Sequence, residues 1–183
     1  RWAHDKQEEA TQAKALIEYF DARREAFPGM HVYHYNHTER SALQAMVAEH
    51  GLEPTLLDEL VNTGLFVDLL PVVRNSLQAG VESYGLKAME QLARYERSHD
   101  IDKGAGAVVE YDRWTHLRDV DTLDRIATYN MDDVRATLAL RDWLIGERSS
   151  DLPWRCTTFT SELSVKRHEL DDLIETLHGS GQP

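Results

Sequence analysis

The residues best suited to chemistry lie in the longest predicted helix, residues 121–146. At 3.6 residues per turn, Ile126, Tyr129 and Asp133 fall on one largely apolar face of that helix. A carboxylate on a core-facing stripe is costly unless it is hydrogen-bonded, protonated or bound to a metal ion. Asp132 is expected at the edge of the helix, where its charge stays solvated. Asp133 is therefore predicted to be either a metal ligand or a hydrogen-bonded structural carboxylate.

Two further carboxylates accompany predicted strands. Residues 31–35 alternate in the way that is typical of a strand, and Glu39 follows early in the next helix. Glu39 either faces the same site as Asp133 or only complements the dipole of its own helix. Asp68 interrupts the apolar run 65–70, which is typical of a buried strand in a mostly parallel sheet. For Asp68 we expect a buried, hydrogen-bonded carboxylate in preference to a metal ligand.

Histidine and cysteine side chains are the usual ligands of zinc. Four histidines lie between residues 31 and 50, namely His31, His34, His37 and His50. Strand alternation places His31 and His34 on opposite faces, and no cysteine accompanies them, so a zinc site is not favoured. The single cysteine, Cys156, cannot form an internal disulfide bond. This favours a reducing, cytoplasmic compartment.

The elements that would position these residues follow from periodicity and turn signals. Strands and helices alternate between residues 27 and 146, which predicts an α/β domain. The sequence 149–153 is typical of a linker, so we expect a domain over residues 1–148. Residues 149–183 would then form the linker and a last amphipathic helix, with Leu163, Leu170 and Leu177 at heptad spacing. Other helices are expected over about residues 5–27, 54–64, 72–78, 84–95 and 107–117.

The charge balance restricts the possible partners. The chain has 32 acidic and 20 basic residues and a net charge of −12. Proteins that hold nucleic acid by neutralising phosphates are usually basic. Either the chain does not bind nucleic acid, or bound metal ions and a neighbouring domain supply the positive charge. The sequence has no apolar run long enough to span a bilayer and nothing like a signal peptide, so no membrane partner is expected.

Several motifs in order resemble a known family. Tyr129 and Asp133 form the Tyr-x-x-x-Asp arrangement of the third motif of DEDD-type 3′–5′ exonucleases, and Thr128 stands where a second subclass has histidine. Residues 31–39 resemble the second motif of that family, although Glu39 replaces its usual aspartate. Together with residues 66–69 and 83–90, these sequence segments are similar to the ribonuclease-H-like domain of RecB-like nucleases. The resemblance covers about residues 31–144.

This resemblance implies an α/β fold, with a ribonuclease-H-like mixed sheet flanked by helices. It implies metal-dependent hydrolysis of phosphodiesters at 3′ ends, by a two-metal site that takes Mg²⁺ or Mn²⁺. Asp133 and Glu39 would be metal ligands, and Tyr129 would orient the attacking water. The implied partners are single strands or 3′ ends, DNA in preference to RNA. Neighbouring nuclease and superfamily 1 helicase domains of the same polypeptide are implied as well.

One family feature is missing from the sequence. The family takes two carboxylates from an Asp-x-Glu on its first strand, and nothing before His31 has that pattern. We therefore expect that the first strand or strands are missing from this chain, that its metal site is incomplete and that the chain is inactive by itself. The alternative function is a non-catalytic ribonuclease-H-like module that couples nuclease and helicase domains or binds a partner. An Asp-x-Glu strand just upstream in the parent gene would separate the two.

Overall fold

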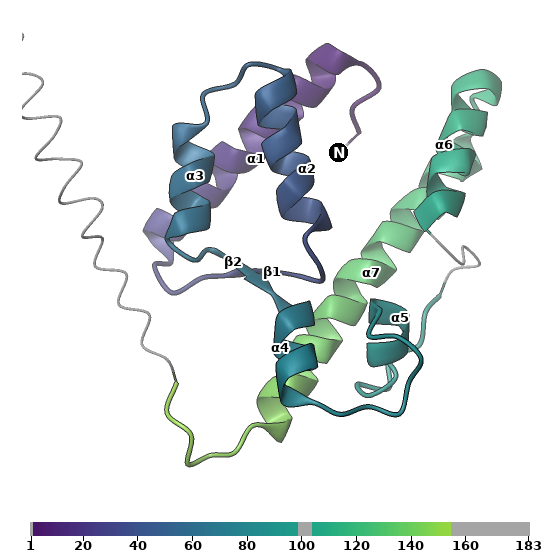
Figure 1. Cartoon of the computed structure of the whole chain (residues 1–183). Helices are drawn as coiled ribbons and strands as arrows, with labels where there is room; N and C mark the ends of the chain where they lie inside the picture. The colour runs from purple at the N-terminus through teal and green to yellow at the C-terminus, as the bar shows by residue number, and fades with distance from the viewer. Residues whose placement is uncertain (1, 99–103, 155–183) are drawn as a thin grey trace, which may run out of the picture.

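The computed structural model describes residues 2–98 and 104–154, and it is mostly helical (Figure 1). Helices α1, α2 and α3 group at one end of a short sheet, and α4, α5 and α7 group at the other (Figure 1). In chain order the elements are α1 (Lys6–Ala26), β1 (Val32–His34), α2 (Thr38–Glu49), α3 (Thr55–Asn62), β2 (Phe66–Asp68), α4 (Leu69–Ser76), α5 (Leu86–Met89), α6 (Gly104–Leu117) and α7 (Val120–Glu147).

The two strands pair in parallel, with Val32 opposite Phe66 and His34 opposite Asp68. Helices α2 and α3 form the crossover between them, as a parallel connection requires. Within the described residues the sheet has these two strands, so the mixed sheet expected from the sequence is not confirmed. The alternation of strand and helix is confirmed, and it is compatible with an α/β fold of the ribonuclease H type.

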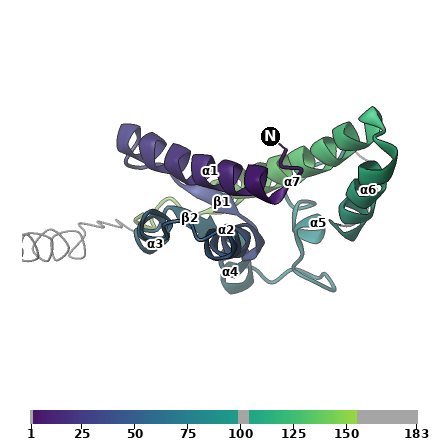
Figure 2. The ribbon, with the colours of Figure 1, turned by 90° about the horizontal axis from the view of Figure 1, so that it is seen from above.

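Two apolar clusters hold the described residues together. The first joins α1, α2 and α3 through buried side chains that include Ile17, Val47 and Leu60. The second joins the end of β1 to α4, α5 and α7 and includes Val73 and Leu140. Figure 2 shows α1 along one side of the strands and α2, α3 and α4 along the other. The strands thus lie between the two clusters, and their carboxyl ends lead toward the second.

Most of the predicted helices are present close to their expected ends. Asp5 caps α1 by accepting a hydrogen bond from the backbone N–H of Glu8 at 2.7 Å. Helix α2 ends just before Gly51, whose φ of 60° lies in the left-handed region that glycine tolerates best. The longest helix, predicted over 121–146, extends from Val120 to Glu147.

The region 65–70 differs from the prediction of one apolar strand. The strand ends at Asp68, and α4 begins at Leu69. The cause is the Asp68 side chain, which accepts a hydrogen bond from the backbone N–H of Leu70 at 2.9 Å and so caps the helix. Pro71, expected to begin a helix at residue 72, therefore lies inside the first turn, where its missing N–H costs little.

The region 84–95 also differs from the prediction. Only α5, Leu86–Met89, is helical, and turns follow it. Arg94 has a φ of 53°, a left-handed conformation that interrupts a right-handed helix. The chain beyond it, residues 95–98, is bound by side chains of α7. These long-range contacts outweigh the local preference for helix.

The end of the described chain has no regular structure. Residues 149–152 turn after α7, and the Arg148 guanidinium lies 3.9 Å from the centre of the Trp154 ring. The predicted last helix, with Leu163, Leu170 and Leu177, lies outside the described residues, as does Cys156. The domain boundary at residue 148 therefore stays a prediction. Among the described residues, no helix combines the length and apolarity that crossing a bilayer requires.

Candidate functional site

Helix α7 carries two adjacent carboxylates with different environments. Its buried face is defined by residues such as Ile126, Ala136 and Leu140. Asp132 lies one turn before Ala136 and is only 1% exposed. The Asp133 side chain is 36% exposed. The expectation that Asp132 stays solvated at the edge of the helix is therefore wrong.

Asp132 is buried because the segment 95–98 supplies its hydrogen-bond donors. One carboxylate oxygen accepts from the Tyr95 hydroxyl at 2.6 Å. The other accepts from the backbone N–H and the hydroxyl of Ser98, at 2.8 and 3.0 Å. Burial and this carboxylate together raise the pKa of Tyr95 to about 12. Asp132 is thus a satisfied buried carboxylate that fastens the segment to α7.

Asp133 contacts the same segment through Arg97. The Arg97 Nη1 atom donates to Asp133 Oδ1 at 2.6 Å. The opposite edge of the guanidinium, Nε and Nη2, binds both carboxylate oxygens of the buried Glu90 at 2.7 Å each. The hydrogen bonds to Glu90 are the largest cause of a raised pKa of Arg97, and the bond to Asp133 raises it further. Burial of the guanidinium acts in the opposite direction and lowers the pKa. A cation that is 12% exposed therefore bridges two carboxylates.

Tyr129 lies one helical turn before Asp133 and is half-buried. Burial raises the pKa of the Tyr129 hydroxyl, and the charge of the neighbouring Asp133 carboxylate raises it further. The structure therefore brings together the tyrosine and the aspartate of the predicted Tyr-x-x-x-Asp motif. The hydroxyl remains a proton donor at neutral pH.

Glu39 lies in the first turn of α2, just after the carboxyl end of β1. Its side chain is 61% exposed, and one carboxylate oxygen lies 3.8 Å from Nδ1 of the buried His34. Asp68, at the carboxyl end of β2, accepts a hydrogen bond from the backbone N–H of Asn36 at 2.8 Å. Asp68 is therefore a hydrogen-bonded structural group in this arrangement, as expected, and it joins the two strand ends.

The carboxyl ends of the strands lead toward α7 (Figure 1). Helix α7 packs against β1, where the Arg141 guanidinium lies 5.1 Å from the centre of the Tyr33 ring. Glu39 thus follows the strand against which α7, the helix of Asp133, packs. Within the described residues, however, neither belongs to a group of three or more metal-ligating side chains with gathered donor atoms. As they lie, these residues do not fit a divalent metal ion, and Asp133 has Arg97 as a partner.

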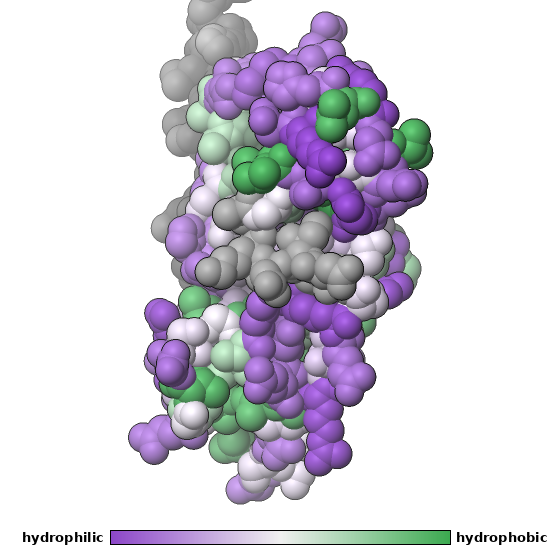
Figure 3. Space-filling model, turned by 90° about the vertical axis from the view of Figure 1, so that its right-hand side faces the viewer, coloured by the Kyte–Doolittle hydropathy of each residue, from purple (hydrophilic) through white to green (hydrophobic). Residues whose placement is uncertain are grey.

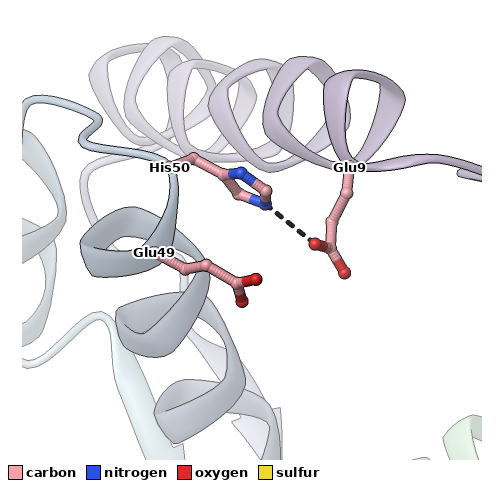
Figure 4. A group of neighbouring side chains, drawn as sticks. All are labelled: Glu9, Glu49 and His50. Atoms are coloured by element: carbon pink, nitrogen blue, oxygen red, sulfur yellow. Dashed lines mark hydrogen bonds and ion pairs between the residues drawn. The ribbon is translucent and has the colours of Figure 1, made fainter.

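One gathered group of potential ligands lies elsewhere, between α1 and α2, and consists of Glu9, Glu49 and His50 (Figure 4). His50 Nε2 lies 2.8 Å from Glu9 Oε2. Lys6 supplies a cation, with its Nζ atom 2.7 Å from Glu49 and 3.1 Å from Glu9. The hydrogen bond to His50 and then that to Lys6 lower the pKa of Glu9. This cluster joins two helices through its own lysine, and no zinc is needed to balance its charge.

Sequence reasoning missed Glu90, Tyr95, Arg97 and Ser98. No spacing rule connects the last three to α7, because their partners on that helix lie more than thirty residues away along the chain, and Glu90 is linked to α7 through Arg97. Asp132 and Asp133 themselves gave a weak indication. Two adjacent carboxylates beside the apolar face of a helix need hydrogen-bond donors from elsewhere in the chain if they are buried. The face in Figure 3 shows mainly hydrophilic residues with apolar ones scattered among them, in keeping with the polar composition.

The two parallel strands and the crossover helices between them are compatible with an α/β fold of the RNase H type. A family model of the RNase H superfamily matches residues 2–145, well over half of the chain. The chain therefore belongs to the RNase H superfamily. No curated protein and no solved structure matches it.

Proposed function

We propose that this chain is the nuclease module of a RecB-like protein that removes nucleotides from 3′ ends of single-stranded nucleic acid, with DNA preferred over RNA. Tyr129, Asp133 and Glu39 are the site residues in this proposal. Mg²⁺ or Mn²⁺ would be the cofactor, and neighbouring nuclease and helicase domains would be partners. Membership of the RNase H superfamily supports a nuclease-type fold.

The observation that carries the proposal is the position of Tyr129 one turn before Asp133 on α7, with both side chains partly buried. A tyrosine hydroxyl beside a carboxylate on the same helix face can position a water molecule or a phosphate oxygen. Glu39 and Asp68 stand at the carboxyl ends of the two strands, where sites of parallel sheets usually form. The described residues do not complete a metal site, so we derive no catalytic step through an ion.

A second function, a non-catalytic module that binds a partner, is favoured by two specific observations. Asp133 is ion-paired with Arg97, and the net charge of −12 disfavours tight contact with phosphates. In that case Asp132 and Asp133 would serve only to fasten the segment 95–98. The two functions make opposite predictions for hydrolysis by the parent protein.

The deciding experiment uses the parent protein, in which we expect an Asp-x-Glu strand upstream of Arg1. Single-stranded DNA labelled at its 5′ end is incubated with the protein and Mn²⁺, and the products are resolved by length. Progressive shortening from the 3′ end is expected, together with its loss in Asp133→Asn and at least about a tenfold slowing in Tyr129→Phe. Equal rates for wild-type and Asp133→Asn proteins would reject the site.

Two controls make this assay specific. Asp124→Asn changes an exposed carboxylate of the same helix and should leave the rate unchanged. The 183-residue chain alone should degrade DNA and RNA poorly in either metal, because its carboxylate set is incomplete. Robust degradation by this chain that disappears in Asp133→Asn would mean that the remaining ligands lie within it.

A further inference from the structure

Helix α7 carries apolar side chains on its exposed side. Four large ones are between 45% and 63% exposed, namely Met131, Val134, Leu138 and Ile145. At 3.6 residues per turn these four, which we call the α7 stripe, share one narrow face opposite the buried Ala136 and Leu140. The two apolar clusters of the described residues do not include them. Exposed apolar residues that gather in this way usually mark a surface that another segment or molecule covers.

The spacing of the α7 stripe is repeated near the end of the chain. Met131, Leu138 and Ile145 are seven positions apart, and so are three leucines outside the described residues, Leu163, Leu170 and Leu177. The sequence predicts that these leucines share one face of a helix. Two apolar faces with a heptad repeat can pack along each other as paired helices. In an antiparallel pair three contacts form together, Ile145 with Leu163, Leu138 with Leu170 and Met131 with Leu177.

The chain between the two sets of residues is short and turns directly after α7. The helix ends at Glu147, and in the turn that follows the backbone N–H of Leu152 donates to the carbonyl of Ser149 at 3.3 Å. A chain that reverses here and continues as a helix runs back along α7. The tether also keeps the segment near its own α7, at an effective concentration on the order of millimolar. The segment of the same chain is therefore favoured as the occupant over a second copy.

Charged residues beside the α7 stripe select one register of this pair. Arg135 and Asp142 are exposed, and the Asp142 side chain is 57% exposed although it also binds Arg141. With Leu138 opposite Leu170, Asp142 lies at the level of Arg167 and Arg135 at the level of Asp171. A shift by one heptad brings Arg135 to Arg167 in one direction and Asp142 to Asp171 in the other. Flanking charges of opposite sign thus support the register that the apolar residues give.

We propose that the C-terminal segment of this chain docks on the α7 stripe as an antiparallel helix, with Leu163, Leu170 and Leu177 against Ile145, Leu138 and Met131. The docked segment covers apolar surface that the two clusters leave exposed. Tyr129 and Asp133 lie toward the other side of α7, so docking leaves them uncovered. The inference therefore does not depend on the nuclease function.

The test is disulfide formation in the 183-residue chain, after Cys156→Ser has removed its own thiol. One protein carries Leu138→Cys and Leu170→Cys, and a matched control carries Leu138→Cys and Leu177→Cys. The control pair is displaced by one heptad, about 10 Å along the helix, which is too far for a disulfide bond. Under a mild oxidant we expect the first pair to close within single chains at least about tenfold faster. Electrophoresis without reductant separates closed chains from linked dimers.

A charge exchange tests the register. In the protein with Leu138→Cys and Leu170→Cys, Arg167→Asp places two acidic groups at one level and should slow closure about threefold. Addition of Asp142→Arg restores opposite signs and should return the rate toward that of the parent pair. Equal rates in the three proteins would overturn the register.

The other outcomes decide whether the segment docks at all. Equal closure of the Leu170 and Leu177 pairs, or closure of neither, overturns the proposal, and dimers linked through the first pair assign the stripe to a second copy. A second measurement leaves α7 unchanged. Leu170→Glu should undock the segment and increase the binding of an apolar dye, whereas Asp172→Asn, on the opposite face of the predicted helix, should not. Equal dye binding by Leu170→Glu and the wild type also overturns the proposal.

Discussion

Asp132 accepts two hydrogen bonds from Ser98 through one carboxylate oxygen, from the backbone N–H at 2.8 Å and from the hydroxyl at 3.0 Å. The other oxygen binds the Tyr95 hydroxyl. Since Asp132 is almost fully buried, these donors replace the water that a carboxylate would otherwise bind. The contact between α7 and the segment 95–98 thus depends on a polar group in the interior.

Replacement of Asp132 by Ala should destabilise the chain by about 2–4 kcal/mol, because it leaves buried donors unsatisfied and opens a cavity. The free energy of unfolding in urea, followed by circular dichroism, measures this effect. Asp124→Ala, on the exposed side of the same helix, is the matched control and should change stability by less than about 0.5 kcal/mol. Similar values for the two variants would contradict the role given to Asp132.

Replacement of Asp133 by Asn should destabilise the metal-free chain by about 1 kcal/mol, because Arg97 loses a charge-assisted bond that solvent partly screens. A metal ligand without a counter-cation would behave in the opposite way. Repulsion among gathered carboxylates would be relieved, and stability in chelator would be unchanged or slightly increased. Urea titrations of both proteins in excess chelator distinguish these signs, and a stabilised variant would contradict the ion pair with Arg97.

The sequence patterns predicted the long helices correctly, because an amphipathic repeat over several turns is a strong local signal. The 21-residue α1 and the 28-residue α7 were expected close to their observed ends, because periodicity over several turns is a local property. The environment of Asp132 could not be predicted in this way. Its donors lie 34 and 37 positions earlier in the chain, in a region whose own pattern favoured a longer helix than α5.

In the candidate site too, residues within one element were predicted and the long-range partner was not. Tyr129 and Asp133 were predicted to share a face, and both lie on α7 one turn apart and partly buried. Glu39 was predicted by its position after a strand, and it does follow β1. Whether these residues bind metal stays a prediction. Arg97 was not foreseen, because an arginine in a polar loop has no periodicity, and Glu90 and Asp133, which it binds, lie in different parts of the chain.

The pKa of Tyr35 gives a prediction for alkaline pH. The pKa of Tyr35 is raised from 10.0 to about 12, and burial is the largest cause. The positive charge of Arg74 lowers this pKa, and the negative charge of Asp68 raises it. The folded state then keeps its proton where the unfolded state loses it. The stability that this difference contributes is present below pH 10 and is lost as pH rises toward 12.

Replacement of Tyr35 by Phe should therefore flatten the decline in unfolding free energy above pH 10. Its stability at neutral pH should also fall, because the carbonyl of Tyr84 loses the hydroxyl that donates to it. Tyr19→Phe, at an exposed position of α1, should keep the wild-type slope. Parallel alkaline slopes for the two variants would show that Tyr35 does not retain its proton in the folded state.

Glu9 gives the corresponding prediction for acid. The hydrogen bond with His50, and after it that with Lys6, lowers the pKa of the Glu9 carboxyl in the folded state. The stability that this shift contributes is present above pH 4.5, the pKa in the unfolded state, and is lost as pH falls through the lower pKa of the folded state. Glu9→Gln should therefore lose less stability than the wild type when pH is lowered from 5.5 to 3. Glu18→Gln, an exposed residue of the same helix, serves as the reference. An acid response of Glu9→Gln as steep as that of Glu18→Gln would rule out this linkage.

A chain ended after Arg148 should unfold as cooperatively as the 183-residue chain. Both apolar clusters are built from residues up to Leu144, and the contact of Arg148 with Trp154 lies on the surface. Urea titration of the shortened chain tests the predicted boundary at residue 148. Broad, non-cooperative unfolding of the shortened chain would place the segment 149–183 within the cooperative unit.

The parallel pairing of β1 with β2 also has a kinetic consequence. It joins residues thirty-four positions apart, so closing this loop from the unfolded chain costs entropy before any strand contact forms. Helices α2 and α3 lie between the strands, and their formation shortens the span that remains to be closed. We therefore expect the strands to pair late on the folding pathway, after the buried residues Leu57 and Leu60 of α3 have packed. A substitution at Leu57 or Leu60 should then slow folding as well as destabilise the folded state.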